Sequence, residues 1–427
     1  MRKYFPLLLV EFYLLGTILI FFTGPVSFNV RNAWHFSLLL CFYHLSFIFG
    51  YLIACVKSIQ GGRLKGEIFS IKMYLALFFL GAASILITYK NLMLSETMIP
   101  YDFFENLLRG LSEPGLVYSE RMQAMEAGGQ SDSRLFNIVS IVFSYSKLLF
   151  IFYFIYFWRD LNFKCKVLSI VYSFLFVSSG ISAGVNSVVF IFFIFLILSV
   201  LTVLSVRGSV VLNRVLLISS LIFLIPVSSF GYIMSKRGGG FDYFAGTSAL
   251  GDISVAVNFQ LDENASIFDF LYYSFVWLDY YVTQGYYGFS LILDVNWDWT
   301  YGFGNSAFLQ RQFLLLTGGD VSKLTFQSKI SHYWDESAQW HSFYGQFAND
   351  FGLYGLIVFL FGLGYLFSKT WQAALNESFF AAALVPLFAI MFIFFPANNQ
   401  VFAYIDMLSY FFVVNIFWFF ENRRLRF

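Results

Sequence analysis

Apolar runs of about 20 residues recur along most of the chain, and they restrict its architecture more than any other feature, since this length crosses a bilayer as a helix. Backbone polar groups in hydrocarbon must be hydrogen-bonded within the protein, so such runs span membranes as helices. The composition agrees, with 59% hydrophobic and 12% charged residues, about half the charged fraction of soluble domains. We therefore predict an all-α polytopic membrane protein.

Ten apolar runs predict about ten transmembrane helices. They cover residues 4–22, 34–56, 71–89, 136–158, 167–182, 188–205, 215–234, 351–367, 379–395 and 401–420. Residues 267–293 are also apolar, but Asp269, Asp279 and Gln284 interrupt them. We predict that this segment forms helices in or over the membrane interface rather than an eleventh span. Residues 178–186, which are small and polar, predict a tight turn at the outer face.

The distribution of Lys and Arg predicts the orientation. Short cytoplasmic loops of membrane proteins are enriched in these residues. The segments that ten spans place on one side carry fifteen of the 26 basic residues, which puts both termini in the cytoplasm. The predicted domains are residues 1–235, with spans one to seven and an outer loop at 91–135; residues 236–350, a large periplasmic loop; and residues 351–427, with spans eight to ten and a basic cytoplasmic tail.

Residues 236–350 are the long polar segment of the chain. They contain twelve acidic and five basic side chains, together with many Trp and Tyr. A segment with this charge is not stable in hydrocarbon, and its aromatic content is not that of a disordered linker. We expect it to fold over the outer face of the membrane and to contain the functional site.

Three arginines near the outer boundary are candidates for binding phosphate. Arg237 follows the seventh span and precedes three glycines, Arg311 lies deeper in the loop, and Arg134 lies at the mouth of the fourth span. A guanidinium binds oxyanions in a bidentate manner and keeps its charge, so these residues suit a lipid-linked phosphate. The alternatives are an interfacial anchor for Arg237 and an ion pair with an acidic neighbour for Arg311.

Two short blocks resemble a known family. Residues 279–290 read Asp-Tyr-Tyr-Val-Thr-Gln-Gly-Tyr-Tyr-Gly-Phe-Ser, and residues 340–344, Trp-His-Ser-Phe-Tyr, run into Asn-Asp-Phe-Gly-Leu-Tyr-Gly at 349–355. They resemble the tyrosine and glycine block, and the aromatic and acidic segment before a glycine-rich span, of bacterial oligosaccharide repeat-unit polymerases, the Wzy-type O-antigen polymerases. Phe289 departs from the leucine expected there. The matched positions Tyr281, Gly285, Tyr286 and Gly288 are structural or stack on sugars.

The resemblance implies a membrane glycosyltransferase of lipopolysaccharide biosynthesis. Such an enzyme moves a growing glycan from undecaprenyl diphosphate to the non-reducing end of the next lipid-linked repeat unit, at the outer face of the bacterial inner membrane. Donor and acceptor are then both undecaprenyl-diphosphate-linked oligosaccharides, surrounded by membrane lipids, and a chain-length regulator is an implied partner. No cofactor is expected, and the net charge of +1 provides no basic field for nucleic acid.

Attack of a sugar hydroxyl on an anomeric carbon needs a proton acceptor, cations for the departing diphosphate and surfaces for the sugars. The loop supplies these candidate proton acceptors: His332, His341, Asp279, Asp335 and Glu336. His341 is the first choice, because histidine titrates near neutral pH and it lies in a matched block; the alternative is a structural histidine. The predicted catalytic set is therefore His341, Arg237, Arg311 and Asp279. The predicted substrate-binding set is Tyr281, Tyr286, His332, Trp340 and Arg134.

The three cysteines predict no metal site. Residues 294–298, Asp-Val-Asn-Trp-Asp, offer oxygen ligands for a cation, but a solvated turn is the favoured interpretation. Other functions remain open. An O-antigen ligase would share the chemistry, but its expected arginine-rich outer loop is thin here. A flippase or secondary transporter predicts charges at the membrane midplane and two similar halves. Glu11 and Asp406 lie within predicted spans and are either functional or paired between helices, whereas Lys147 is expected to reach the interface.

Overall fold

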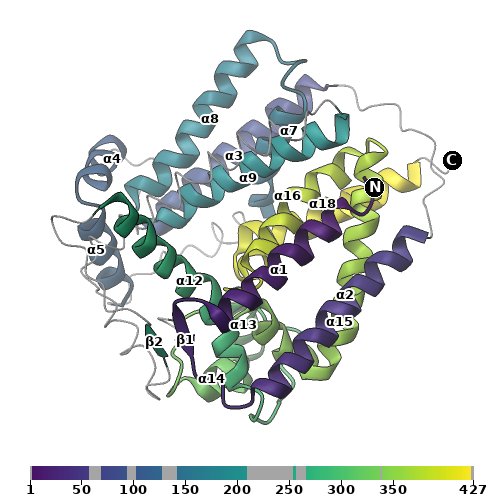
Figure 1. The fold of residues 1–427 in the computed structure, drawn as a ribbon. Coiled ribbons are helices and arrows are strands. Elements are labelled where there is room, and N and C mark those ends of the chain that lie inside the picture. The colour runs from purple at the N-terminus through teal and green to yellow at the C-terminus, as the bar shows by residue number, and fades with distance from the viewer. Residues whose placement is uncertain are drawn as a thin grey trace. The chain divides into compact units, whose positions relative to one another are not determined.

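The computed structural model describes residues 2–56, 69–93, 102–126, 142–208, 253–255, 266–336 and 339–424, and their fold is all-α apart from one two-stranded sheet (Figure 1). Six of the described helices are long and apolar enough to cross a membrane. They are α1 (Phe5–Thr23), α2 (Ala33–Val56), α3 (Ile71–Leu92), α8 (Phe163–Ser182), α9 (Asn186–Arg207) and α15 (Phe343–Leu375). Each contains or closely matches a predicted span, which confirms the all-α fold and gives six candidate membrane-spanning helices.

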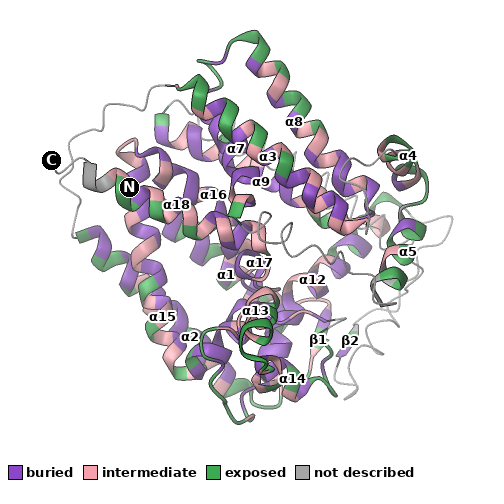
Figure 2. Ribbon diagram, turned by 180° about the vertical axis from the view of Figure 1, so that it is seen from behind, coloured by how far each residue is buried: buried purple, intermediate pink, exposed green. Residues whose placement is uncertain are grey.

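The candidate spans carry both buried and exposed residues along their length, as α8 shows in Figure 2. On α1 the large exposed side chains are apolar. This helix buries Leu7, Val10 and Leu14 within the protein. The opposite face exposes Leu8 and Phe12, the latter by 82%. A continuous exposed apolar face of this kind is stable against lipid but not against water.

Three further predicted spans are shorter or outside the described residues. Residues 215–234 are not described. The span predicted at 136–158 contains α7 (Tyr145–Tyr156), and the span at 379–395 corresponds to α16 (Phe379–Phe394); both are apolar helices of 10–17 residues. At 1.5 Å per residue, α16 extends about 24 Å, less than the roughly 30 Å of a bilayer core. The total of ten spans stays a prediction.

The last predicted span, residues 401–420, is divided into two helices. α17 (Gln400–Ala403) begins at Asn399, whose side chain accepts a hydrogen bond from a backbone N–H of the first turn. Tyr404 is extended and ends it, and α18 (Ile405–Arg424) follows. The apolar run therefore predicts the helical region but not the break within it.

The chain forms two compact units. Unit 1 comprises Met1–Gln60, Val211–Gln372 and Phe388–Tyr404, and unit 2 comprises Gly61–Val210, Ala373–Leu387 and Ile405–Phe427. The described part of the segment predicted as the periplasmic loop, residues 236–350, belongs to unit 1 together with α1 and α2. The sequence-based domain boundaries, which follow predicted membrane crossings, remain predictions.

Unit 1 is built around α12 (Ile267–Leu291), the segment for which we predict interfacial helices. It is one continuous helix, and Ser266 and Asp269 close its N-terminus with reciprocal hydrogen bonds, a capping box. Its hydropathy does not place it among the candidate spans. In Figure 1, α12 runs across α1 rather than along it, and the two helices pack together. Beside this crossing, β1 (Val26–Phe28) pairs antiparallel with β2 (Ile253–Val255).

Helix α15 has a kink at Gly352, whose φ of +66° and ψ of 171° lie outside the helical region. The ring of Trp297 lies where a side chain at position 352 would be, 3.3 Å from an ideal Cβ, and its indole N–H donates to the Asn349 carbonyl. Glycine is the residue that adopts this φ without strain. The predicted eighth span begins at the kink, but helical structure begins eight residues earlier, at Phe343.

Small residues bring α15 and α2 into close contact beyond the kink. An ideal Cβ at Gly50 would lie 2.0 Å from the Phe361 carbonyl oxygen, and one at Gly364 would lie 2.2 Å from the Phe47 carbonyl oxygen. The Tyr43 hydroxyl also donates to the Leu353 carbonyl at 2.7 Å. Glycines permit close backbone approach between membrane helices, where packing replaces the hydrophobic effect.

Unit 2 contains α3, α7, α8, α9 and α18, with two short helices, α4 (Phe103–Ser112) and α5 (Pro114–Glu126), at the ends of α3 and α8. The turn predicted within 178–186 is confirmed: α8 ends at Ser182, and Gly184 has a φ of +64° before α9 begins. An ideal Cβ at Gly110 of α4 would lie 2.1 Å from the Ile181 carbonyl oxygen. Helix α4 is thus held tightly against the end of α8.

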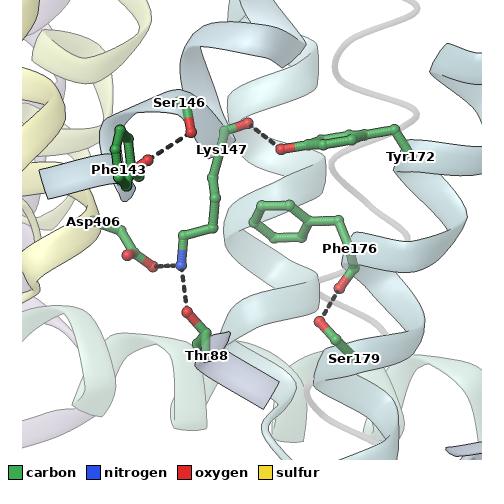
Figure 3. A network of polar contacts seen from close by, with 8 residues as sticks. All are labelled: Thr88, Phe143, Ser146, Lys147, Tyr172, Phe176, Ser179 and Asp406. Atoms are coloured by element: carbon green, nitrogen blue, oxygen red, sulfur yellow. Dashed lines mark hydrogen bonds and ion pairs between the residues drawn. The ribbon is translucent and has the colours of Figure 1, made fainter. Parts of the chain in front are cut away.

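A charged pair lies inside unit 2 (Figure 3). The Lys147 ammonium on α7 is 2.5 Å from an Asp406 carboxylate oxygen on α18 and donates to the Thr88 hydroxyl at 2.9 Å. The side chain of Lys147 is 3% exposed. The expectation that Lys147 reaches the interface is therefore wrong, and Asp406 is paired between helices. Its counterpart in unit 1 is the contact of 2.8 Å between Glu11 on α1 and His44 on α2.

Candidate functional site

Asp279 lies where α12 crosses the end of α1. One carboxylate oxygen accepts a hydrogen bond from the Val26 N–H at 3.1 Å, and the other is 3.2 Å from the Thr283 hydroxyl. The residue is 2% exposed. Burial raises the pKa of Asp279 to about 6, although both hydrogen bonds oppose this change. A carboxylate with this pKa is a useful proton acceptor near neutral pH.

Residues 339–343 lie against α12 and bring aromatic side chains together. The Trp340 N–H donates to the Gln284 side-chain oxygen at 3.0 Å, and the Ser342 N–H donates to the Gly285 carbonyl at 3.2 Å. The rings of Tyr281 and Trp340 meet edge to face, with centroids 5.0 Å apart. Two predicted substrate-binding residues, distant in sequence, are therefore neighbours.

Gly285 allows this packing. An ideal Cβ at this position would lie 2.3 Å from the Pro396 carbonyl oxygen, 2.5 Å from that of Ala397 and 2.7 Å from the Ser342 nitrogen. All three are backbone atoms, which move less readily than the end of a side chain. The tyrosine and glycine block thus has a structural reason for a glycine here.

We expect Gly285→Ala to destabilise unit 1 by about 3 kcal/mol or more, at the upper end of overpacking effects, because no neighbour can yield. The matched control is Gly16→Ala in α1, where an ideal Cβ meets nothing within 4 Å. The control should be neutral or stabilising by about 0.5–1 kcal/mol, since alanine favours a helix. Thermal unfolding of both purified variants measures the difference, and equal stability would contradict this account of Gly285.

His341 is buried, and neither ring nitrogen has a hydrogen-bond partner among the described residues. Its Nδ1 is 3.2 Å from the position of an ideal Cβ at Gly288. Burial lowers the pKa of His341 to about 3, so the imidazole is neutral near pH 7 and a weak proton acceptor. Among the predicted acceptors, Asp279 therefore fits the role better, and the catalytic role of His341 stays a prediction.

Tyr286 is completely buried between helices. Its hydroxyl is 3.0 Å from the Thr17 hydroxyl, and its ring stacks on that of Tyr344 with centroids 6.3 Å apart. These contacts hold α12 against α1 and α15. Of the two functions that the matched block allows for this tyrosine, the structural one accounts for its position.

Other predicted residues lie apart from this cluster. Arg311 is exposed on α13 (Ala307–Thr317) and forms no ion pair with a described residue. His332 is exposed after α14 (Phe326–Ile330), where its ring contacts that of Tyr333. Two further predicted acceptors follow in the same exposed turn: Asp335 and Glu336. The other two predicted phosphate ligands lie outside the described residues: Arg237 and Arg134.

Asp350 fixes the loop at residues 300–305, a role that the sequence analysis does not assign to it. Its carboxylate accepts hydrogen bonds from the Thr300 hydroxyl at 2.5 Å, from the Gly304 N–H at 3.0 Å and from both nitrogens of Asn305 at 3.1 and 2.6 Å. The neighbouring Asn349 side chain donates to the Gly304 carbonyl at 3.0 Å. The position of Asn349 and Asp350 directly before the kink of α15 at Gly352, inside a matched block, is the sequence signal for this anchor.

Four predicted residues thus lie along α12: Asp279, Tyr281, Trp340 and His341. We call these four residues the α12 site. Asp279 and Gly288, which contacts His341, are nine residues apart on the helix, a rise of about 13 Å. The two predicted acceptors therefore do not share one reacting centre.

Among the described residues, no three His, Cys, Asp or Glu side chains come together as metal ligands. No family model, curated protein or solved structure matches this chain.

Proposed function

We propose that this chain is a membrane glycosyltransferase that polymerises lipid-linked oligosaccharide repeat units. The observation that carries the proposal is the α12 site, where the buried carboxylate of Asp279, with its raised pKa, lies two positions before Tyr281 on α12. The half-buried ring of Tyr281 contacts that of Trp340. Its place at the end of a candidate span, rather than midway along one, suits two lipid substrates whose sugars project from the membrane surface. We assign the site to the outer face of a bacterial inner membrane on the distribution of basic residues.

The proposed reaction has one bond formed and one broken. A hydroxyl oxygen at the non-reducing end of the acceptor attacks the anomeric carbon of the donor. The bond from that carbon to the diphosphate breaks, and undecaprenyl diphosphate leaves with the electron pair. Asp279 takes the hydroxyl proton. Since Val26 covers this carboxylate, the acceptor reaches it only when β1 moves aside, a gating step of the kind that closes many active sites.

The remaining groups bind and orient. Tyr281 and Trp340 offer aromatic surfaces for sugar rings, whose C–H faces are apolar. Arg237 and Arg311 are the proposed cations for the negative charge that develops on the diphosphate, and Arg311 lies on α13, outside the α12 site. Arg311 is exposed without an ion pair among the described residues, so its guanidinium is available to a phosphate.

A membrane carrier is the second candidate, and the pairs of ionisable residues inside both units favour it. Ionisable residues within membrane helices often mark transport pathways. Glu11 and His44 are held at 2.8 Å, and Lys147 and Asp406 at 2.5 Å. Each of these ionisable groups already has a partner on another helix, so interhelical stabilisation accounts for both contacts without a transported ion.

Deletion of the gene from its source bacterium separates these functions. If the chain is a polymerase, lipopolysaccharide on a gel should carry a single repeat unit, because ligation of one unit still proceeds. Loss of a ligase or of a carrier should leave no repeat unit on the lipid A core. Complementation with Gly16→Ala should restore the full ladder of lipopolysaccharide bands with increasing numbers of repeat units. If this ladder persists in the deletion strain, the polymerase proposal is contradicted.

A further inference from the structure

Two exposed aromatic rings and a half-buried third one form a row in unit 1. The rings of Trp299 and Tyr301 have centroids 4.8 Å apart, and Tyr301 lies nearly parallel to Phe313 of α13, at 6.1 Å and 6°. Trp299 is 56% exposed and Tyr301 54% exposed. We call these three residues the aromatic platform. Large aromatic side chains that remain uncovered together are typical of a binding surface.

The backbone holds the platform in place. Tyr301 has a φ of +58°, a left-handed conformation that strains a residue with a side chain and persists where the surroundings impose it. Here the surroundings are the hydrogen bonds from Thr300 and Gly304, on either side of Tyr301, to the buried Asp350 carboxylate. The rings are therefore presented by a preorganised loop, which reduces the entropy lost on binding.

The groups beside the platform are charged. The Lys329 ammonium lies 2.8 Å from the Asp298 carboxylate and donates to the Asn296 carbonyl at 2.7 Å. The Asp298 side chain is 57% exposed. Contact with lipid tails would desolvate these groups without replacing their hydrogen bonds, which is unfavourable. A sugar ring offers an apolar face to the aromatic rings and hydroxyl groups to the carboxylate and ammonium.

We infer that the aromatic platform is a glycan-binding subsite, separate in sequence from the α12 site. This inference rests on the proposed function and deepens it, because an enzyme that elongates a glycan must hold sugars beyond the reacting unit. Trp299 and Tyr301 stack on the sugar rings, Phe313 supports Tyr301, and Asp298 and Lys329 bind hydroxyl groups at the edge.

The test measures binding of oligosaccharide fragments, prepared by hydrolysis of the source bacterium's own surface polysaccharide, to the full chain in lipid nanodiscs. Trp299→Ala and Tyr301→Gly should each raise the Kd by about tenfold or more, as expected for aromatic anchors. Tyr301→Gly removes the ring and suits the positive φ, so the loop should keep its conformation. The matched control is Leu316→Ala, on an α13 side chain that is 80% exposed, and it should leave the Kd unchanged.

Two results would overturn the inference. One is an unchanged Kd in both platform variants. The other is quenching of the tryptophan fluorescence by brominated lipids in the wild type that is lost in Trp299→Phe. Such quenching would show that Trp299, and with it the platform, faces the bilayer. Failure of the proposed function gives a different result. If the chain binds fragments through the platform but elongates no glycan, the glycan-binding subsite is supported and the polymerase function is contradicted.

Discussion

Replacing Asp406 by asparagine is expected to destabilise unit 2 by about 3–5 kcal/mol, because it leaves a buried ammonium without its counter-charge. Lys147 is 3% exposed, whereas Asp406 is 33% exposed, so the two halves of the pair are not equivalent. Lys147→Met leaves a carboxylate that water partly solvates, and its effect should be smaller. The double variant Lys147→Met, Asp406→Asn removes both charges and should recover most of the lost stability.

Thermal unfolding in one detergent compares these variants. Arg109→Ala is the control in the same unit, since the Arg109 and Glu120 side chains are 43% and 50% exposed and such surface pairs contribute within about 1 kcal/mol. An Asp406→Asn variant no less stable than Arg109→Ala would show that the buried pair does not stabilise unit 2. Recovery in the double variant separates the loss of a counter-charge from a general packing defect.

Asp279→Asn should lower the polymerisation rate by about 100-fold or more, the lower limit for removal of a general base. The wild-type rate should fall as the pH decreases through about 6, because the raised pKa of Asp279 means that the carboxylate loses its ability to accept a proton there. Asparagine cannot accept that proton at any of these pH values. The small residual rate of the variant should therefore not show the same inflection.

The fold of this variant should survive. The amide oxygen of asparagine can still accept the hydrogen bond from the Val26 N–H. The folded-state pKa of Asp279 lies above its ordinary value, so the folded state binds the proton more tightly and stability decreases as the pH rises from about 4 to about 6. Asparagine removes this loss, and the variant should be at least as stable as the wild type at pH 8. A normal rate with an unchanged pH profile would eliminate Asp279 as the proton acceptor.

Local sequence patterns predict much of the fold. Apolar runs of membrane length identify the helices from α1 to α15 that are long enough to span, because that property depends on neighbouring residues only. The same patterns place α12 outside the spans, since Asp279 and Gln284 interrupt its apolar character. They do not give the break at Tyr404, which depends on hydrogen bonding around Asn399.

The candidate site could not be predicted from local patterns, because it depends on contacts between residues that are distant in sequence. No local pattern shows that Gly285 meets Pro396, or that Lys147 pairs with Asp406 across 259 positions. Residue type alone favours His341 as the base, but its tertiary burial lowers its pKa, which the sequence does not show. For Asp279 the effect of burial is the opposite. This carboxylate interrupts the apolar segment of α12 and is buried, and burial raises its pKa to a value suited to proton transfer.

In the proposed reaction, this chain alone joins lipid-linked repeat units. The direct test is reconstitution of the purified protein in liposomes with an undecaprenyl-diphosphate-linked repeat unit from the source bacterium. The account predicts a ladder of lipid-linked glycans, with one undecaprenyl diphosphate released for each unit added and little product with Asp279→Asn. Movement of the intact lipid-linked unit across the bilayer, with no new glycosidic bond, would contradict it and identify a carrier instead.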